Sequence, residues 1–343
     1  MRGTRRLGAA GLSTGCAVVA AVAVTAVAPQ HQVHQPAPRP SHRQAQGAEQ
    51  QSGPESARAG GRLRVMTFNA WVGGSWVRNA LGKQVSVVRK FRPDVIGMQE
   101  TRGHAARDLA KRLGWHYRQS RNDLGVVSRY PIEQVTGVTS AGAGVRIRMP
   151  GGKKAEVWTS HMAYRPYGAY DACYGRMSGK RILGREARSG RTGQAKELAG
   201  KLRVKAMTAG ATDTPLILVG DFNSPSHLDW TAATRKRHCG YGPFNWPVTK
   251  AIAGAGLRDS FRVKHPDPGN QPGNTWSPVY PRHNGSTGRR EPQNRTDYIT
   301  YAGNMRVLHS RTVVVGHPKA RPHHRNNVWP SDHKAVLTEF GVS

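Results

Sequence analysis

The sequence is poor in cysteine. It contains three cysteines in 343 residues, and one of them, Cys16, lies in an apolar stretch near the N-terminus. The other two, Cys173 and Cys239, are too few for a structural zinc site of their own. An even number of cysteines in an exported protein favours one disulfide, with two independent thiols as the alternative.

Acidic residues are also scarce. Asp and Glu together number 20 against 52 Lys and Arg, so the formal net charge is +32. Most of this charge lies in residues 62–343. It predicts attraction to polyanions such as nucleic acid, anionic wall polymers or acidic lipid head groups. A surface that is basic only for solubility is the alternative.

Only one long uncharged apolar run occurs, over residues 7–28, and it follows Arg2, Arg5 and Arg6. A basic start, an apolar centre and a small-residue end at Ala26-Val27-Ala28 are typical of an export signal. A single-pass anchor is the alternative, but the many Ala and Gly residues make the run weakly hydrophobic. We therefore expect residues 1–28 to be removed, the mature chain to be secreted, and no membrane span to remain in it.

Large apolar residues are nearly absent from residues 29–61, which are rich in Pro, Gln, Ala and Gly. Such a segment cannot bury enough surface to offset the entropy cost of ordering it, so we expect a disordered linker. The sequence has no internal repeat. Residues 62–343 are therefore expected to form one domain.

Strand-like and helix-like segments mingle in residues 62–343 without strict alternation. This arrangement favours an α/β sandwich with mixed sheets over a doubly wound fold. Residues 266–293, rich in Pro, Gly and Asn, are expected to be a loop. The predicted helices span residues 77–91, 105–113, 192–207 and 246–256, and the predicted strands span residues 63–69, 94–100, 124–128, 155–161, 215–220, 297–301 and 335–340.

Polar side chains recur at the ends of these apolar strands. They are Asn69, Glu100, His161, Asp221, Asn223, Asp297, Asp332 and His333. Strand ends that carry carboxylates, amides and imidazoles are where an α/β scaffold places its site. Each of them alone also suits a turn, because Asp and Asn hydrogen-bond their own backbone.

The residue types indicate the chemistry. Glu100 and Asp332 offer hard oxygen ligands without accompanying cysteine, which favours Mg²⁺ or Mn²⁺ over zinc. Hydrolysis also needs a base, and a carboxylate holds a neutral imidazole in the right tautomer near neutral pH. His333 with Asp297 is the expected pair.

Seven short motifs occur in one order along the chain. They are Met66-Thr67-Phe68-Asn69, Met98-Gln99-Glu100-Thr101, Gly125-Val126-Val127-Ser128-Arg129-Tyr130-Pro131-Ile132, Ser160-His161, Gly220-Asp221-Phe222-Asn223, Arg295-Thr296-Asp297-Tyr298-Ile299 and Ser331-Asp332-His333. As an ordered set they resemble the endonuclease/exonuclease/phosphatase superfamily, with its deoxyribonuclease I-like fold, over nearly all of residues 62–343.

This resemblance implies a four-layered α/β sandwich with two packed mixed β-sheets and its site across one end of them. It implies that Glu100 ligates the metal, with Asn69 and Asp332 close to it. Asp221 and Asn223 are then expected to orient the attacking water and the phosphate, and His161 to bind a phosphate oxygen. Whether Asp221 or the His333–Asp297 pair is the base stays open.

Two features depart from the family pattern. Ala70 and Trp71 follow the first Asn, where many relatives carry an acidic or small polar residue, so a second metal position is doubtful. Residues 164–174, with one Arg and four Tyr, have no counterpart in minimal nucleases. We expect Asn69, Arg165 and Tyr167 to contact substrate, since aromatic and cationic side chains bind bases and phosphates. A lid held by a Cys173–Cys239 bridge, or simple packing, are the alternatives.

Together these observations predict a secreted, monomeric phosphoesterase dependent on Mg²⁺ or Mn²⁺, with DNA or RNA as the expected substrate. The alternative substrates are phospholipid head groups, inositol phosphates or other small phosphoesters. A polyanion-binding protein on an inactive version of the fold is a third hypothesis. The complete set of site residues argues against it.

Overall fold

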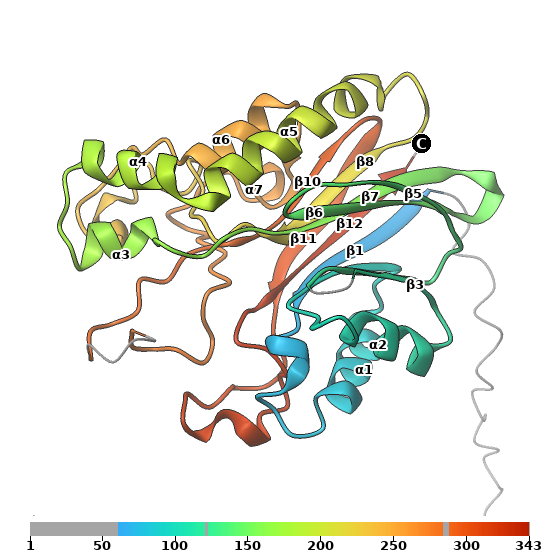
Figure 1. Ribbon diagram of the computed structural model, residues 1–343, viewed down its shortest axis with the longest axis horizontal. Coiled ribbons are helices and arrows are strands. Elements are labelled where there is room, and N and C mark those ends of the chain that lie inside the picture. The colour runs from blue at the N-terminus through green and yellow to red at the C-terminus, as the bar shows by residue number, and fades with distance from the viewer. Residues whose placement is uncertain (1–60, 121–122, 284–287, 343) are drawn as a thin grey trace, which may run out of the picture. The chain divides into compact units, whose positions relative to one another are not determined.

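The computed structural model describes residues 61–120, 123–283 and 288–342. The predicted export signal, and the predicted linker apart from Gly61, lie outside these residues. The described residues form an α/β unit with two β-sheets packed face to face and helices on both outer surfaces (Figure 1). The four-layered sandwich expected from the sequence is confirmed.

The first sheet has six strands in the order β11-β12-β1-β2-β4-β3. β1 and β2 run parallel, and their other neighbours are antiparallel. The strands are β1 (Arg62–Asn69), β2 (Val95–Gln99), β3 (His116–Gln119), β4 (Gly125–Ser128), β11 (Met305–Val313) and β12 (Ala335–Val342).

The second sheet also has six strands, in the order β5-β6-β7-β8-β10-β9. Only β7 and β8 are parallel neighbours in it. The strands are β5 (Ile132–Val138), β6 (Gly142–Arg148), β7 (Lys154–His161), β8 (Leu216–Asp221), β9 (Arg258–Asp259) and β10 (Asp297–Ala302).

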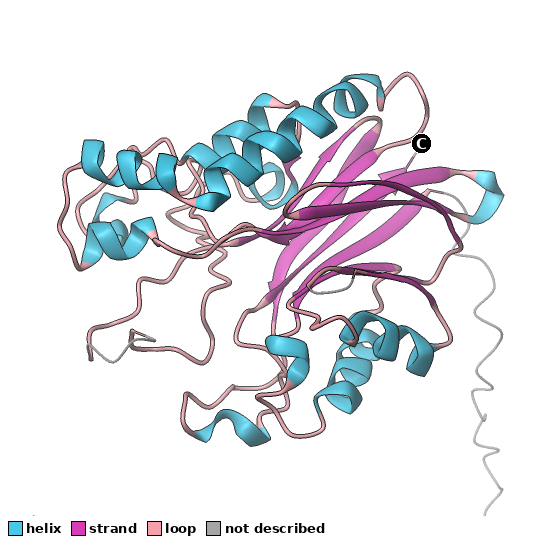
Figure 2. Cartoon of the chain, viewed as in Figure 1, coloured by secondary structure: helices cyan, strands magenta, loops and turns pink. Residues whose placement is uncertain are grey.

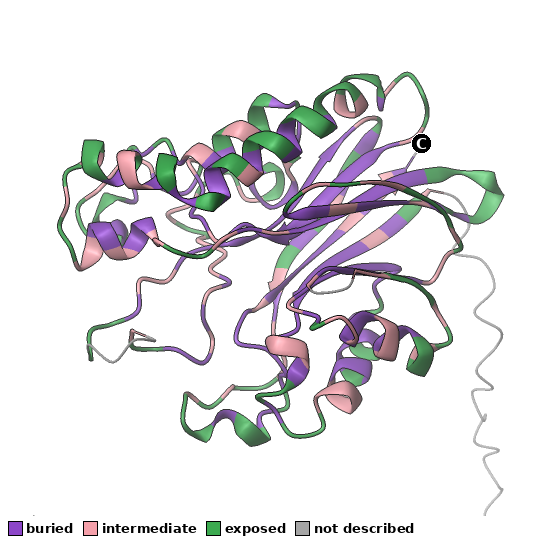
Figure 3. Cartoon of the chain, in the orientation of Figure 1, coloured by how far each residue is buried: buried purple, intermediate pink, exposed green. Residues whose placement is uncertain are grey.

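Alternation along β1 shows how the layers are built. Leu63 and Val65 belong to the core between the sheets, whereas Met66 and Phe68 belong to the core beneath the helices α1 (Ala80–Phe91) and α2 (Ala105–Leu113). Successive strand residues face opposite sides, so one strand serves two cores. On the other outer surface α5 (Gly190–Thr208) and α6 (Pro247–Gly254) cover the second sheet (Figure 2). Buried residues accordingly fill the strands, and exposed ones lie on the outer helix faces (Figure 3).

The two sheets approach each other closely at Gly97 in the middle of β2. A Cβ atom placed there would lie 2.1 Å from Cγ2 of Val219 on β8. Such a contact is far inside van der Waals distance, so glycine is the residue that fits. The close approach brings the ends of β2 and β8 together.

The chain between β7 and β8 adds two short helices to the sandwich. These are α3 (Gly168–Cys173) and α4 (Gly179–Arg188), in the stretch left as an insertion by the sequence. A disulfide between Cys173 and Cys239 ties α3 to the 3₁₀ turn η3 (Arg235–His238), as the even cysteine count favoured. Among the helices of the described residues, none has the length and apolar character needed to cross a bilayer.

The predicted elements are present with shifts of a few residues at their ends, and residues 266–293 form no helix or strand among those described. The helix expected from residue 77 begins at Ala80. Strands β3, β5, β6 and β11 and helices α3 and α4 were not predicted. The short elements η1 (Val72–Gly74), η2 (Pro150–Gly152), α7 (Ser260–Lys264) and η4 (His323–Asn326) complete the fold.

Candidate active site

Strand register assembles the predicted site at one edge of both sheets. Asn69 pairs with Gln99 across the parallel strands β1 and β2, so Glu100 follows directly beside it. His161 pairs with Asp221 across β7 and β8, and Asp221 pairs with Asp297 at the start of β10. The carboxyl ends of parallel neighbours lie at the same sheet edge, so these side chains meet.

Glu100 is oriented by two donors. Its Oε1 accepts from Nδ2 of Asn69 at 3.0 Å, and its Oε2 accepts from the backbone N–H of Val72 at 2.8 Å. Its backbone has φ 54°, which is uncommon for a residue other than glycine and is associated with functional sites. The carboxylate is therefore held in one orientation before any ligand binds.

Asn69 acts on both neighbouring carboxylates as a donor. Its Nδ2 lies 3.0 Å from Oε1 of Glu100 and 3.3 Å from Oδ2 of Asp221, while its Oδ1 accepts from the N–H of Trp71. Since its oxygen is already engaged, the structure places Asn69 as the residue that orients Glu100. Its direct ligation of a metal stays a prediction.

Asp332 carries the clearest sign that the site suits a cation. The residue is buried, and its Oδ1 has no hydrogen-bond partner among the described residues. Burial, opposed by the charge of His333 and reinforced by that of Glu100, raises the pKa of Asp332 to about 8. A buried carboxylate oxygen without a partner is costly unless it is protonated or meets a cation. Glu100 and Asp332 thus fit a divalent ion that prefers oxygen ligands.

His333 forms the expected pair with Asp297. Its Nδ1 lies 2.8 Å from Oδ2 of Asp297, and both residues are buried. Its Nε2 lies 3.6 Å from Oδ2 of Asp221. Burial lowers the pKa of His333, but Asp297 and Asp221 outweigh it and raise that pKa well above its ordinary value. The imidazole is therefore a cation in the substrate-free protein, hydrogen-bonded to Asp297.

Asp221 lies at the centre of the site. Burial raises its pKa to about 6, with the charge of His333 opposing this and that of Asp297 adding to it. Its Oδ1 accepts from the N–H of Asn223 at 2.9 Å, and Nδ2 of Asn223 donates to the carbonyl of Met162 at 2.9 Å. These hydrogen bonds fix the turn from Asp221 to Asn223, which the sequence left open as either part of a site or a simple turn. A carboxylate with a pKa near 6 is suited to accept a proton near neutral pH.

His161 is held by Asp123, a residue not predicted from the sequence. Nδ1 of His161 lies 2.7 Å from Oδ2 of Asp123, whose Oδ1 accepts from the N–H of Glu100 at 3.1 Å. Burial lowers the pKa of His161, but the Asp123 hydrogen bond and the charge of Asp221 outweigh it and raise that pKa to about 9. Asp123 comes just before a strand, with no spacing that links it to His161, so only its position as an acid ahead of an apolar strand could have marked it.

Asp221, Asp297 and His333 also form a group that meets the geometric demand of a metal site. One ligand atom from each lies within 4.8 Å of the others. The carboxylates raise the pKa of His333, and its protonated ring supplies positive charge to this group. This group therefore serves either proton transfer or a second cation, whereas the unpartnered oxygen of Asp332 calls for a cation.

The insertion places Arg165 and Tyr167 differently. Arg165 is exposed, with its guanidinium 5.0 Å from the ring centre of Tyr164. The hydroxyl of Tyr167 is buried, and burial together with the charge of Glu291 raises its pKa well above the ordinary value. The sequence left open whether Tyr167 packs or contacts substrate. Its hydroxyl is buried, as in packing, and its contact with substrate stays a prediction.

A buried ion pair anchors the insertion. Arg191 is fully buried and donates to Glu186, to the carbonyl of Ala163 at 2.9 Å and to the carbonyl of Pro166. These hydrogen bonds to backbone carbonyls hold the segment between His161 and α3 in place.

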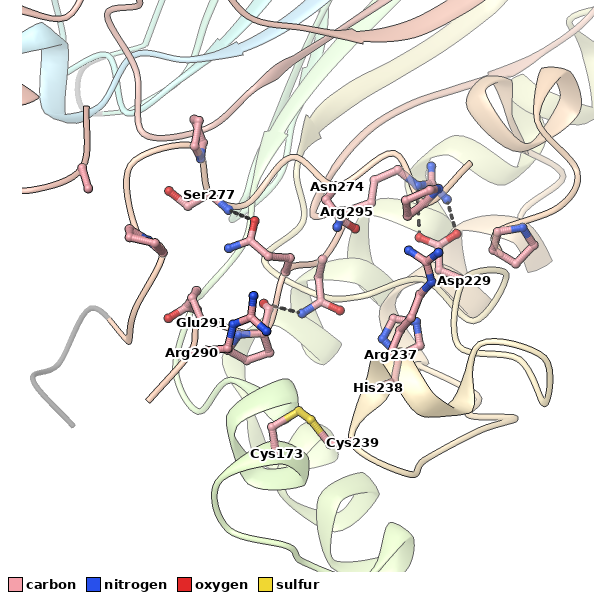
Figure 4. A pocket seen from close by; sticks show the side chains of 18 of the residues that line it. Cys173, Asp229, Arg237, His238, Cys239, Asn274, Ser277, Arg290, Glu291 and Arg295 are labelled. Carbon is pink, nitrogen blue, oxygen red and sulfur yellow. Dashed lines mark hydrogen bonds and ion pairs between the residues drawn. A yellow bond between two sulfur atoms is a disulfide. The ribbon is translucent and has the colours of Figure 1, made fainter. Parts of the chain in front are cut away.

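A second buried ion network supports Asp297. Arg295 donates to Asp229 at 2.8 Å and to Asp259 at 2.6 Å, and Arg262 donates to the same Asp229 at 2.6 Å. Asp229 and Arg295 are seen in a cavity of about 850 Å³ that also reaches the disulfide (Figure 4). Arg262 and Arg295 are already paired with these acids, so they brace the backbone that leads to Asp297.

Comparison with known proteins agrees with the geometry. Residues 66–333 match the model of the "Endonuclease/Exonuclease/phosphatase family". The chain belongs to this family. Members of the family are metal-dependent phosphoester hydrolases, and the chain is accordingly an enzyme of that class.

An uncharacterized protein of Caenorhabditis elegans is a similar family member, 33% identical over 291 residues, which cover 81% of this chain and 91% of that protein. Among solved structures, an AP endonuclease from Archaeoglobus fulgidus has a TM-score of 0.50 and 17% identity, covering 80% of this chain and 98% of that one. The 3′ phosphatase NExo from Neisseria, bound to a product DNA hairpin, has a TM-score of 0.51 and 19% identity, covering 81% and 99%. At these identities the solved structures show that the family enzyme shares their fold.

Proposed function

We propose that this family enzyme is an exported nuclease that hydrolyses phosphodiester bonds of DNA or RNA with Mg²⁺ or Mn²⁺. One observation carries the chemical part of the proposal. The Nε2 atoms of His161 and His333 both converge on Oδ2 of Asp221, at 3.8 and 3.6 Å. These distances exceed a direct hydrogen bond and suit a phosphate oxygen or water that enters between the groups.

Each group of residues has its own role in the proposed reaction. Asp221 accepts a proton from the attacking water, because its carboxylate is the most central acceptor and its pKa lies near 6. The cationic imidazoles of His161 and His333 bind phosphate oxygens and stabilise the negative charge of the transition state. Glu100 and Asp332 would hold the divalent ion, which would supply Lewis-acid chemistry at the phosphate.

The nucleic-acid part of the proposal is supported by charge. The formal net charge of +32 favours a polyanionic substrate and predicts rates that fall steeply with salt. The similar Neisseria enzyme is bound to a product DNA hairpin, and the similar Archaeoglobus protein is an AP endonuclease by name, which supports a nucleic-acid substrate on this fold.

The second candidate is a phosphatase or phosphodiesterase for phospholipid head groups, inositol phosphates or other small phosphoesters. The observation in its favour is that the same fold carries a 3′ phosphatase, whose bond is a terminal monoester. The site residues serve both reactions equally.

Export, as a monomer, is part of the proposal. The basic and apolar start of the chain supports it, and so does the Cys173–Cys239 disulfide, because disulfides persist in oxidising compartments. Expression of the full chain and mass spectrometry of the protein in the medium tests removal of residues 1–28. Size-exclusion chromatography with light scattering tests the oligomeric state.

A substrate panel tests the activity. The purified protein is offered plasmid DNA, RNA, sphingomyelin, inositol phosphates and bis(4-nitrophenyl) phosphate, each with Mg²⁺, Mn²⁺ or EDTA. We expect cleavage of a nucleic acid that stops with EDTA. Turnover of a small ester or lipid with no cleavage of either nucleic acid replaces the nuclease proposal by the second candidate.

A further inference from the structure

An aromatic ledge extends from the catalytic histidine to the surface. We define it as Trp276, Tyr280, Trp71 and Trp76. The ring of Trp276 lies 4.9 Å from that of His333 and 5.2 Å from that of Tyr280, and Trp71 lies 6.4 Å from Tyr280 and 6.1 Å from Trp76. The ledge thus connects the reacting centre with a side chain that is 40% exposed, Trp76.

The same ledge borders the proposed metal ligands. The N–H of Val72, next to Trp71, donates to Glu100 at 2.8 Å. The charges of Asp332 and Glu100 also contribute to the raised pKa of Tyr280, after burial as the main cause and against the lowering hydrogen bond from Arg321. A continuous row of aromatic rings therefore leads from a group bound on Trp76 to a phosphate bound at the site.

Arg321 covers the outer part of the ledge. Its guanidinium lies 4.9 Å from the ring centre of Trp76 and 5.7 Å from that of Tyr280, and it donates to the hydroxyl of Tyr280 at 3.0 Å. A guanidinium held over an indole offers a flat cationic surface beside a flat aromatic one. Nucleobases stack on both kinds of surface.

His324 packs behind the two tryptophans of the ledge. It is buried, with its ring 5.0 Å from that of Trp71 and 6.2 Å from that of Trp76. Its Nδ1 lies 3.2 Å from the carbonyl of Pro322, and its Nε2 is buried from solvent. His324 therefore supports the indoles from the interior.

The charge around the ledge favours a strand of nucleic acid over a lipid. Residues 70–93 and 303–331 contain no Asp or Glu, and Arg78, Arg321 and Arg325 lie exposed within them. A phosphate backbone is attracted to this surface. The quaternary ammonium of a phosphocholine head group is repelled by the positive charge of these arginines.

We propose that Trp76 and Arg321 form a subsite for an unpaired nucleobase of the bound strand, so that the enzyme prefers single-stranded substrate. Stacking on a side chain needs a base released from its duplex neighbours. The proposal rests on the proposed nuclease function. It adds the form of nucleic acid that the site accepts.

Binding and cleavage are tested separately with the full-length chain. Fluorescence anisotropy in EDTA measures binding of a labelled single-stranded oligonucleotide and of the same strand carrying abasic positions. We expect the wild-type protein to bind the base-containing strand about tenfold more tightly, the scale of one stacked base. We expect Trp76→Ala to remove this preference and Trp76→Phe to retain most of it.

Tyr117→Ala is the matched control, because Tyr117 is also 40% exposed but lies on the edge strand β3. It should leave the preference unchanged. In the cleavage assay with Mg²⁺, Trp76→Ala should raise KM for the base-containing strand about tenfold. Tyr117→Ala should leave both that KM and the turnover of bis(4-nitrophenyl) phosphate unaltered.

The outcomes separate the two proposals. Equal binding of the two strands by the wild type, or an equal loss with Trp76→Ala on all substrates, overturns the subsite. The subsite is also overturned if the Trp76→Ala protein no longer sediments with phosphatidylserine vesicles but still prefers the base-containing oligonucleotide. A wild-type protein that shows the preference and cleaves no nucleic acid retains the subsite and refutes the nuclease function.

Discussion

The Nε2 atom of His333 lies 3.6 Å from Oδ2 of Asp221, while its Nδ1 is hydrogen-bonded to Asp297. The imidazole thus connects two buried carboxylates that come from β8 and β10. Removing it takes away the cation that pairs with Asp297 and leaves Asp221 with His161 alone, whose Nε2 lies 3.8 Å from Oδ2 of Asp221.

We therefore predict that His333→Ala lowers turnover about 100-fold or more, the scale of a lost group that stabilises charge in the transition state. Asp297→Asn should have an effect in the same direction, because Asp297 orients and charges the ring. Steady-state kinetics on the substrate identified in the panel measure both. His309→Ala, an exposed histidine on β11, is the control, and near-normal turnover of His333→Ala contradicts the assignment.

Asp123 should control the pH range of activity through His161. With its pKa raised to about 9, His161 stays cationic until the pH approaches 9, and its charge on the phosphate is lost above that. Asp123→Asn removes the main group that raises this pKa, so the alkaline limb of kcat/KM should move to lower pH. Asp108→Asn, which breaks the exposed pair with His104, should leave the profile in place. An unchanged limb in Asp123→Asn refutes the role of His161 as a cation.

Metal binding should be visible without activity. The unpartnered, buried oxygen of Asp332 gains a partner when the ion binds, so Mg²⁺ should raise the melting temperature relative to EDTA. Asp332→Asn should abolish this increase, and Glu100→Gln should reduce it and lower turnover about 100-fold or more, as expected for lost metal function. Asp213→Asn, on an exposed turn, should keep the full increase. The same Mg²⁺ shift in Asp332→Asn would place the ion elsewhere.

Reduction of the Cys173–Cys239 bridge should destabilise the domain. The bridge closes a span of 66 residues between α3 and η3. Loss of such a cross-link costs about 2–4 kcal/mol of unfolding free energy. Chemical denaturation with and without reductant measures the difference, and the Cys173→Ser/Cys239→Ser double variant should not respond to reductant. If the wild type unfolds at the same denaturant concentration with and without reductant, the bridge contributes nothing to stability.

His238 should make the domain sensitive to acid. The ring is buried and stacks on Trp230 at 4.5 Å, and burial lowers its pKa from 6.5 to about 4, with Asp229 opposing and Arg237 assisting. Its folded-state pKa lies below the unfolded value, so its stabilising contribution is present above pH 6.5 and is lost as the pH falls toward 4. Melting temperatures across this interval should fall less in His238→Phe than in the wild type. Parallel profiles would show that His238 does not titrate in this range.

The residues at strand ends could be predicted because an apolar run announces a strand, and a polar residue after it marks the sheet edge. Asp221 and His161 follow this rule, since they close β8 and β7. Asp123 does not, since its partner His161 lies 38 positions away with no spacing that relates them. Contacts of this kind depend on tertiary packing.

Other elements escaped prediction for similar reasons. The edge strand β5 is mostly exposed, so its side chains show no apolar alternation. Helix α4 packs through Glu186, whose charge is neutralised by the fully buried Arg191. Both residues look like surface charges in a sequence, because burial of an ion pair leaves no mark in composition.

The contact between Gly97 and Val219 has a consequence for how the enzyme admits its substrate. The two sheets pack so closely here that they cannot slide or hinge past each other without a steric collision. The geometry of the catalytic edge is therefore fixed. Variation between substrates must then be accommodated by the segments around it, the insertion after His161 and the loop that carries Trp276. Directed evolution of specificity should therefore succeed in these two segments and fail in the sheets.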